Sequence, residues 1–207
     1  MNRSRPLVSL GFTEEKFPVG THICQIFSDD EERSTSLMEY LCSGLEDGER
    51  TACFSDKVDK KTLTRMLETI DISLDEAIST GDLGLAGTDE VYFEDNRFDP
   101  ERMLERLAQF EEDSKAAGCV ACRAIGEMNP KVMQIEGGSR LLEYEARVSL
   151  LLRDHPVTTV CQYDATRFDG ATIMDVLRVH PKMIVRGSVV RNPFFIPPEQ
   201  FIEQLNN

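Results

Sequence analysis

Three groups of polar, sulfur-bearing and aromatic side chains could carry chemistry in this sequence, because each lies on or directly after a short apolar segment. The groups are His22 to Phe27 with the acidic residues Asp29 to Glu32, Arg123 to Met128, and Tyr144 and Glu145 with Cys161 to Asp164. If the apolar segments are parallel strands, residues at their carboxyl ends line a common crevice. A ligand-facing position and a simple loop carboxylate are then equally good explanations of Glu127 and Asp164.

Residues 21–56 follow the order strand, loop, helix, strand, which is the layout of a nucleotide-binding unit. A phosphate-binding loop of the G-x-x-x-x-G-K-[ST] type needs glycine N–H groups and a Lys around the phosphates, and a hydroxyl on magnesium. Here the loop reads SDDEERST, and its four consecutive carboxylates would repel a triphosphate that Arg33 alone cannot neutralise. Asp29 and Asp30 are better explained as caps of the following helix. We therefore expect binding without ATP hydrolysis.

The three histidines, His22, His155 and His180, are far apart and form no H-x-x-x-H or H-x-E pair that would predict a metal site. A zinc site assembled in space from His22, His180 and a cysteine stays open as an alternative, because zinc prefers nitrogen and sulfur ligands. Hydrogen-bonded core histidines are the favoured explanation, and the helix dipole explains His155 and His180 at predicted helix ends. We predict neither a metal nor a cofactor.

The composition indicates an ordinary globular protein that does not bind nucleic acid directly. The chain is 41% hydrophobic and 29% charged, and its net charge of −14 argues against the clustered Lys and Arg that phosphate binding needs. No apolar run approaches the roughly 18 residues that span a bilayer, and the first residues lack a signal-peptide pattern, so we expect a cytoplasmic protein. Its six cysteines, including the Cys119 and Cys122 pair, are then expected to be reduced core residues.

Apolar periodicity predicts strands that alternate with helices along the chain. The expected strands are residues 22–27, 51–55, 91–93, 119–125, 157–163 and 183–185, and the expected helices are residues 31–45, 59–70, 73–79, 100–118, 139–153 and 170–179. Asp99 and Pro100 mark a helix start as N-cap and first helical residue. The alternation predicts one α/β domain, doubly wound, with a mainly parallel sheet and helices on both faces. Residues 1–20 are expected to form an irregular N-terminal extension, and a Pro-rich tail follows the last strand.

Several ordered motifs resemble the MEDS domain, a sensory domain described in methanogens and methylotrophs. They are HICQIFSDDEE with GLEDGE, CVACRAIGEM, LLEYEARV, TTVCQYD, and DVLRVHPKMIV followed by NPFFIPPEQF. The resemblance runs from residue 21 to about residue 201, so we assign residues 21–207 to a MEDS-like sensory domain. It implies a RecA-like or KaiC-like fold, P-loop NTPase-like but without a Walker A loop or ATPase activity. It also implies that the domain senses small organic molecules of the one-carbon or halogenated type.

The resemblance further implies candidate ligand-binding residues, to which the acidic loop adds Asp29. The set is His22, Phe27, Asp29, Glu127, Tyr144, Glu145, Cys161, Tyr163 and His180, and Gly126 is a further family-like position. Such domains are usually joined to a DNA-binding helix-turn-helix or a histidine kinase. Because the sensory domain takes up almost the whole chain, we expect a separate regulatory protein partner, either a histidine kinase or a transcription regulator.

The leading hypothesis is a non-catalytic sensory domain that binds a small organic ligand and relays its presence to that partner. One alternative is a protein-binding accessory module of a kinase or an anti-sigma system, because an acidic surface attracts basic partners. Another is a residual nucleotide-binding, ATPase-like protein that holds magnesium through Asp29, Glu127 or Asp164. The apolar stretch from Phe194 to Ile196 is expected to pack back onto the sheet, with docking to a partner or a second copy as the alternative.

Overall fold

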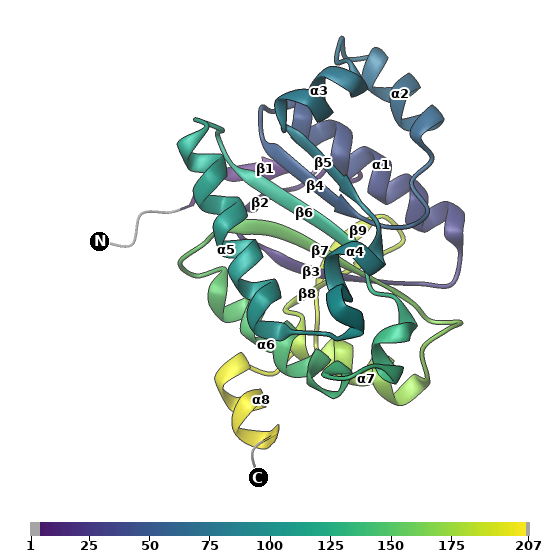
Figure 1. Ribbon diagram of the computed structural model, residues 1–207, viewed down its shortest axis with the longest axis vertical. Coiled ribbons are helices and arrows are strands. Elements are labelled where there is room, and N and C mark those ends of the chain that lie inside the picture. Colours follow the sequence, from purple (N-terminus) through teal and green to yellow (C-terminus); the bar gives the residue numbers. More distant parts are fainter. Residues whose placement is uncertain (1–4, 206–207) are drawn as a thin grey trace.

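The computed structural model describes residues 5–205 and contains a seven-stranded sheet with helices on both faces (Figure 1). The strand order is β5-β4-β6-β7-β3-β8-β9, and neighbouring strands are parallel except β8 and β9. The strands are β3 (His22–Phe27), β4 (Arg50–Phe54), β5 (Leu83–Ala86), β6 (Cys122–Glu127), β7 (Val157–Asp164), β8 (Lys182–Val185) and β9 (Ser188–Arg191). The doubly wound α/β fold predicted from the alternation of strands and helices is confirmed.

Two groups of helices cover the two faces of this sheet (Figure 1). One face, called the α1 face, is covered by α1 (Asp30–Glu46), α2 (Lys60–Glu68) and α3 (Leu74–Thr80). The opposite face, called the α5 face, is covered by α4 (Thr88–Tyr92), α5 (Pro100–Ala116), α6 (Leu141–Leu151) and α7 (Gly170–Val179). Because successive strand residues point to opposite faces, Ile23 and Ile125 pack under α1, whereas Cys24 and Ala124 belong to the α5 face.

The strands present mainly small side chains to the α5 face. Gly84 of β5 pairs with Ala52 of β4, and Ala52 pairs with Ala124 of β6. Ala124 pairs in turn with Thr159 of β7, which completes a row of small residues across four strands. Protein interiors are otherwise close-packed, so a row of small residues under a helix leaves space unless larger side chains reach down to it.

The structure corrects the prediction for one edge of the sheet. Residues 91–93, predicted as a strand, belong to α4 and its C-terminal end, and the edge strand is β5 instead. The sequence of β5, LGLA, is short and contains a glycine, so it carries little strand signal of its own. Pairing with β4 stabilises it as a strand. Glu127, expected in a turn, is the last residue of β6 and pairs with Gln162 of β7.

The two ends of the described chain are also more ordered than the sequence indicates. Within the predicted irregular extension, β1 (Leu7–Ser9) and β2 (Lys16–Pro18) form an antiparallel hairpin, while residues 1–4 lie outside the described part. After β9, the chain forms α8 (Pro198–Leu205), which packs on α6 and α7. Ile196 and Phe201 contact Ala146 and Val179 there, so the apolar stretch packs on helices rather than on the sheet. Phe194 remains 49% exposed.

Across residues 5–205, no helix combines the length and the apolar character that a membrane crossing requires.

Candidate functional site

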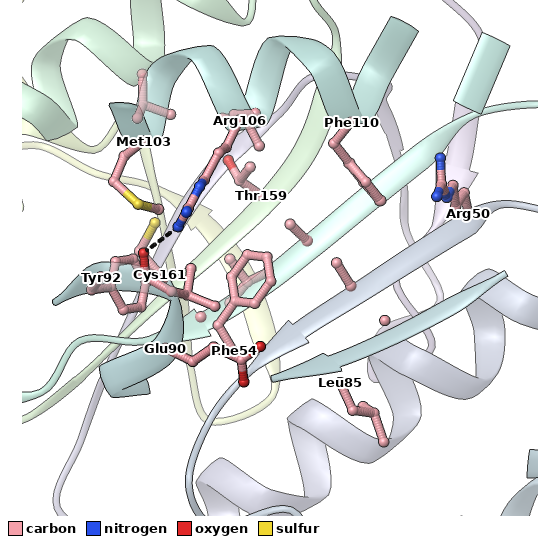
Figure 2. A pocket seen from close by; sticks show the side chains of 18 of the residues that line it. Arg50, Phe54, Leu85, Glu90, Tyr92, Met103, Arg106, Phe110, Thr159 and Cys161 are labelled. Atoms are coloured by element: carbon pink, nitrogen blue, oxygen red, sulfur yellow. Dashed lines mark hydrogen bonds between the residues drawn. The ribbon is translucent and has the colours of Figure 1, made fainter. Parts of the chain in front are cut away.

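A large cavity lies between the α5 face of the sheet and helices α4 and α5 (Figure 2). Its volume is about 950 Å³, and most of its wall is apolar. Phe54, Tyr92 and Met103 crowd one end of the cavity, and Phe110 and Arg50 lie toward the other end (Figure 2). Concave, mainly apolar sites of this size are typical of proteins that bind organic small molecules.

Small residues create the cavity, and one glycine shapes its wall. The floor includes Gly84, Ala52 and Ala124, the row that crosses β5, β4 and β6. A Cβ atom at Gly126 would lie only 2.1 Å from Tyr92 Oη. A residue larger than glycine would therefore push the tyrosine ring of α4 away from β6, which gives a physical reason for the glycine that the resemblance singled out.

Two arginines in the cavity wall are anchored but keep free donors. Arg106 donates from Nη1 to the carbonyl oxygen of Val91 at 2.9 Å and from Nη2 to Glu94 at 2.6 Å. Arg50 donates from Nε to a backbone carbonyl at 3.0 Å, and its guanidinium lies 5.4 Å from the centroid of the Phe110 ring. Because a guanidinium carries five N–H groups, both side chains retain donors for a polar substituent of a ligand.

Four side chains meet at the inner end of the large cavity and are called the histidine cluster: His22, Glu145, Cys161 and His180. Cys161 lines the cavity, and the other three lie behind it, almost fully buried. The Nε2 atoms of His22 and His180 lie 3.4 and 3.5 Å from Glu145 Oε2. Cys161 Sγ lies 3.5 Å from His22 Nε2 and 3.6 Å from Glu145 Oε2. The structure thus brings together both histidines and a cysteine of the zinc alternative, and adds a carboxylate.

Four different elements position this cluster. His22 begins β3, Cys161 lies on the adjacent strand β7, Glu145 lies on α6, and His180 directly follows α7. His180 Nδ1 donates to the carbonyl oxygen of Val176 at 2.8 Å, so the last turn of α7 fixes the orientation of the ring. The helix-end position predicted for His180 is confirmed, and it directs the other ring nitrogen toward Glu145.

Burial governs the charge states in the cluster. Burial, together with the neighbouring His180, lowers the pKa of His22 to about 4. Burial and the Glu145 carboxylate raise the pKa of Cys161 and of Tyr163 well above their usual values. Burial would also raise the pKa of Glu145, but the adjacent His180 and His22 rings, when protonated, bring it well below its usual value. The cluster therefore keeps a buried carboxylate ionised next to imidazole nitrogens.

A separate polar group, called the Glu127 network, lies at the carboxyl ends of the strands and consists of Asp30, Arg33, Ser55, Lys57 and Glu127. Ser55 donates its hydroxyl to Glu127 Oε2 at 2.9 Å, and Lys57 Nζ lies 3.3 Å from Glu127 Oε1. Buried Arg33 donates from Nε to Asp30 at 2.8 Å. The sequence suggested that Arg33 faces the acidic loop alone, but Lys57 from the loop after β4 supplies a second cation, 3.5 Å from Asp30.

The other acidic residues of the magnesium alternative have local partners. Asp29 accepts the backbone N–H of Glu31 at 2.8 Å, which confirms that it caps α1. Asp164 accepts the backbone N–H and the hydroxyl of Thr166 at 2.9 and 2.6 Å. In the part of the chain that the structure describes, the histidine cluster is the one group of three or more His, Cys, Asp or Glu donors close enough to share a metal ion.

The candidate residues therefore fall into neighbouring but distinct places. Tyr144 and Cys161 line the large cavity; His22, Glu145, Tyr163 and His180 lie behind Cys161; Phe27, Asp29 and Glu127 lie at the strand ends. The sequence did not indicate Tyr92, Met103 or Phe110 as cavity residues. Tyr92 lies in the segment mistaken for a strand, and the other two carried only the helical apolar periodicity that any core residue shows.

The sequence and the fold each match known proteins. Residues 21–181 match the profile of the MEDS family, described as the methanogen/methylotroph, DcmR sensory domain. No curated protein matches the sequence. A KaiC-like protein of the hyperthermophilic archaeon Pyrococcus horikoshii has a TM-score of 0.59 and 15% identity, covering 86% of this chain and 79% of that chain. The flagellar accessory protein FlaH of Methanocaldococcus jannaschii has a TM-score of 0.61 and 9% identity, with coverages of 88% and 83%. The fold is therefore RecA-like, as the resemblance implied.

Proposed function

This chain belongs to the MEDS family of sensory domains, and we propose that it binds a small organic ligand in the large cavity and relays the bound state to a regulatory protein. The ligand is of the one-carbon or halogenated type, and the partner is a histidine kinase or a transcription regulator. In this proposal the chain itself performs no catalysis. The large cavity is the observation that carries the proposal.

The wall of the cavity suits a ligand with an apolar body. Phe54, Met103 and Phe110 offer aromatic and thioether surface, and burial contributes about 25 cal/mol for each Å² of apolar surface removed from water. Thioether and thiol groups are also polarizable, which favours contact with similarly polarizable halogen atoms. Arg50 and Arg106 in the wall have free N–H donors that could bind one polar substituent of the ligand.

The size of the ligand decides whether it fills the whole cavity or only one end of it. The volume of about 950 Å³ is near the upper end of typical small-molecule sites, which span roughly 300–1,000 Å³. A one-carbon compound is only a few times larger than a water molecule, whose share of the liquid is about 30 Å³. Such a ligand would occupy one end of the cavity, and the end formed by Phe54, Tyr92 and Met103 offers aromatic and thioether surface.

The loop between β3 and α1 supports a sensor rather than an ATPase. Only Ser28 and Asp29 separate the two elements, and neither is a glycine that could form a phosphate-binding nest. The nearest cations, Arg33 and Lys57, are already paired with Asp30 and Glu127. A triphosphate would have to displace these carboxylates before it gained any neutralising contact.

Substitution of Gly84 tests whether the ligand binds in the cavity. A Cβ atom at this position meets only the Cβ of Ala52, at 4.0 Å, so a larger side chain extends into the cavity without a backbone clash. Gly84→Leu should fill part of the cavity and weaken ligand binding by about tenfold or more, a loss of about 1.4 kcal/mol. Gly84→Ala is the matched control, because it changes the backbone in the same way but adds little volume.

The measurement is a titration of wild type and both variants with a size series, from chlorinated methanes through chlorinated ethanes to small apolar ring compounds. NMR chemical shifts report binding, and thermal unfolding reports the stabilisation that a ligand of the folded state produces. A compound that binds wild type and Gly84→Ala but not Gly84→Leu supports the cavity as the site. Equal binding to all three proteins, or no response to any compound, contradicts the proposal.

A further inference from the structure

The histidine cluster has the geometry of a tetrahedral metal site. An ion bonded at about 2.0–2.1 Å to nitrogen or oxygen and about 2.3 Å to sulfur separates its ligand atoms by about 3.3–3.6 Å. Four of the six separations among the donor atoms are 3.4, 3.5, 3.5 and 3.6 Å, namely those of Glu145 Oε2 to His22, His180 and Cys161, and that of Cys161 Sγ to His22. All four donor atoms lie within 4.8 Å of one another. Four of the six donor separations therefore already match the distances that such an ion would impose.

The hydrogen bonds of the two histidines turn lone pairs toward the centre of the cluster. His180 Nδ1 must donate to Val176, because a carbonyl oxygen only accepts, so the Nε2 of the neutral ring carries a lone pair. Ser149 Oγ lies 2.8 Å from His22 Nδ1 and 3.5 Å from the Val179 carbonyl oxygen, so when Ser149 donates to that carbonyl, His22 Nδ1 donates to Ser149 and its Nε2 carries a lone pair. Both Nε2 atoms thus face Glu145 Oε2, which is itself an acceptor.

This arrangement leaves a buried polar atom without a partner. His180 is fully buried, and its Nε2 has no hydrogen-bond donor in the structure. Buried polar atoms are rarely unpaired, and an unpaired one requires a cause such as a missing ion. A cation at the centre of the cluster would satisfy His180 and remove the repulsion between facing lone pairs.

The surroundings of the four donors match those of metal ligands. A metal-bound histidine usually donates its other ring N–H to an oxygen, and metal-bound carboxylates are themselves hydrogen-bonded. Val176 and Ser149 hold the two imidazoles in this way, and the Tyr163 hydroxyl donates to Glu145 Oε1, the oxygen that faces away from the centre. These contacts would fix the ligand orientations before an ion binds.

We propose that the histidine cluster binds one divalent transition-metal ion of the zinc type through His22 Nε2, His180 Nε2, Glu145 Oε2 and Cys161 Sγ. The Glu145 carboxylate and a Cys161 thiolate together balance the two positive charges, so the buried site is neutral. Two imidazoles and a thiolate favour zinc, or cobalt as its substitute, over magnesium or calcium. Because Cys161 also lines the large cavity, the ion would lie against the inner end of the proposed ligand site.

The rival explanation is a proton in place of the ion. In that case a protonated His180 would form a buried ion pair with Glu145, and the protein would contain no stoichiometric metal. Metal analysis of the purified full-length chain separates the two explanations and does not depend on any cavity ligand. If the titrations with the Gly84 variants show no ligand binding, the metal content of the protein is still a valid test of the metal site.

The experiment begins with wild-type protein prepared with zinc and then stripped and reloaded with cobalt. We expect about one zinc ion per chain, and intense visible bands of tetrahedral cobalt with a sulfur-to-cobalt charge-transfer band in the near ultraviolet. Negligible bound zinc together with no cobalt spectrum would overturn the proposal in favour of the protonated ion pair.

Matched variants locate the site. Cys161→Ala should abolish the charge-transfer band, whereas Cys53→Ala, which removes a buried cysteine on the α1 face, should keep it. His180→Gln should lose the ion, whereas His155→Gln, which removes a histidine beside another glutamate, should not. Because substitutions of the four metal-binding residues can prevent folding, Tyr163→Phe gives a milder test. It removes only the hydrogen bond to Glu145, and we expect a loss of about 10–100-fold in metal affinity. An unchanged cobalt spectrum and affinity in Cys161→Ala and Tyr163→Phe would contradict the assignment.

Discussion

Two buried polar clusters, one on the α1 face and one on the α5 face of the same sheet, differ in how fully their donors and acceptors are satisfied. On the α1 face, Arg123 is buried in a network in which its donors are satisfied. On the α5 face, the histidine cluster contains an unpaired imidazole nitrogen and borders a large cavity. The first cluster is a satisfied structural network, whereas we propose that the second binds an ion, although both rest on the same sheet.

The Arg123 network consists of Arg123, Glu49, Tyr40, Ser43 and Ser9. Arg123 pairs through Nε and Nη2 with both oxygens of Glu49, donates to the Tyr40 carbonyl and the Ser43 hydroxyl at 3.0 Å each, and donates to the Ser9 carbonyl at 2.8 Å. Its guanidinium also lies 4.8 Å from the Tyr40 ring centroid. The sequence grouped Arg123 with possible ligand-binding residues, but its contacts connect the hairpin, α1 and the sheet.

Whether every donor and acceptor is satisfied distinguishes a buried charge with a structural role from one that can bind a ligand. A buried ion pair is tolerated when every donor and acceptor is satisfied, and the Arg123 network meets that condition. An unsatisfied buried nitrogen costs stability and requires a cause, and for His180 we propose a bound ion.

Removal of the Arg123 guanidinium should have the largest effect. Arg123→Ala leaves Glu49 buried without its cation, which typically costs about 3–5 kcal/mol. Urea denaturation measures this loss, and the double variant Arg123→Met with Glu49→Leu should recover part of it because no charge remains buried. A loss below about 1 kcal/mol, within the range of exposed ion pairs, would contradict a structural role for this network.

Metal removal should have the next largest effect and should act through the α5 face. If zinc is present at about 100–1,000 times its dissociation constant, binding stabilises the folded state by about 2.7–4.1 kcal/mol. Chelation should therefore lower the thermal unfolding temperature of wild type but not that of His180→Gln, which has already lost the site. Equal sensitivity of both proteins to the chelator would show that the stabilising metal lies elsewhere.

Gly126→Ala should have an intermediate effect on the cavity wall. The new Cβ would clash with the Tyr92 hydroxyl, and overpacking of this kind costs about 1–3 kcal/mol. Gly170→Ala is the control, because a Cβ there meets nothing within 4 Å. Chemical denaturation of both variants gives the comparison, and equal stability of the two would mean that Tyr92 moves aside without cost.

The smallest effect should come from an exposed ion-pair network on α5 and α6. Hydrogen bonds from Arg140 and Arg147 lower the pKa of Glu101 from 4.5 to about 2. Its stabilising contribution is therefore complete above about pH 4.5 and is lost as the pH falls through about 2. Solvent screening limits it to less than about 1 kcal/mol. Glu101→Gln should remove this pH-dependent part, and a larger loss at pH 7 would contradict the exposed character of the network.

The fold was predictable where apolar periodicity was long and well bounded. Strand β3 and helix α7 have the predicted limits, and Asp99 caps α5 as expected by accepting the backbone N–H of Arg102 at 3.2 Å. The edge strand β5 was not predictable, because pairing with β4 rather than its own short sequence makes it a strand. The same local ambiguity made the helix at Tyr92 look like a strand.

The site was predictable as a set of residues but not as an arrangement. His22, Glu145, Cys161 and His180 were each named, yet their convergence depends on how α6 and α7 pack on β3 and β7, which no local pattern encodes. The cavity was expected at the carboxyl ends of the strands, whereas its floor extends along the strands. Its cause is a row of small residues that align only through the sheet register.

The most direct test of the proposed function is a methyl-selective NMR titration of the full chain with the strongest binder of the chlorinated series. We predict that signals of Met103 and Val148, which line the large cavity, shift on binding, whereas those of Leu37 and Leu63 in the α1-face core stay in place. Shifts confined to Leu37 and Leu63, with Met103 and Val148 unchanged, would contradict ligand binding on the α5 face.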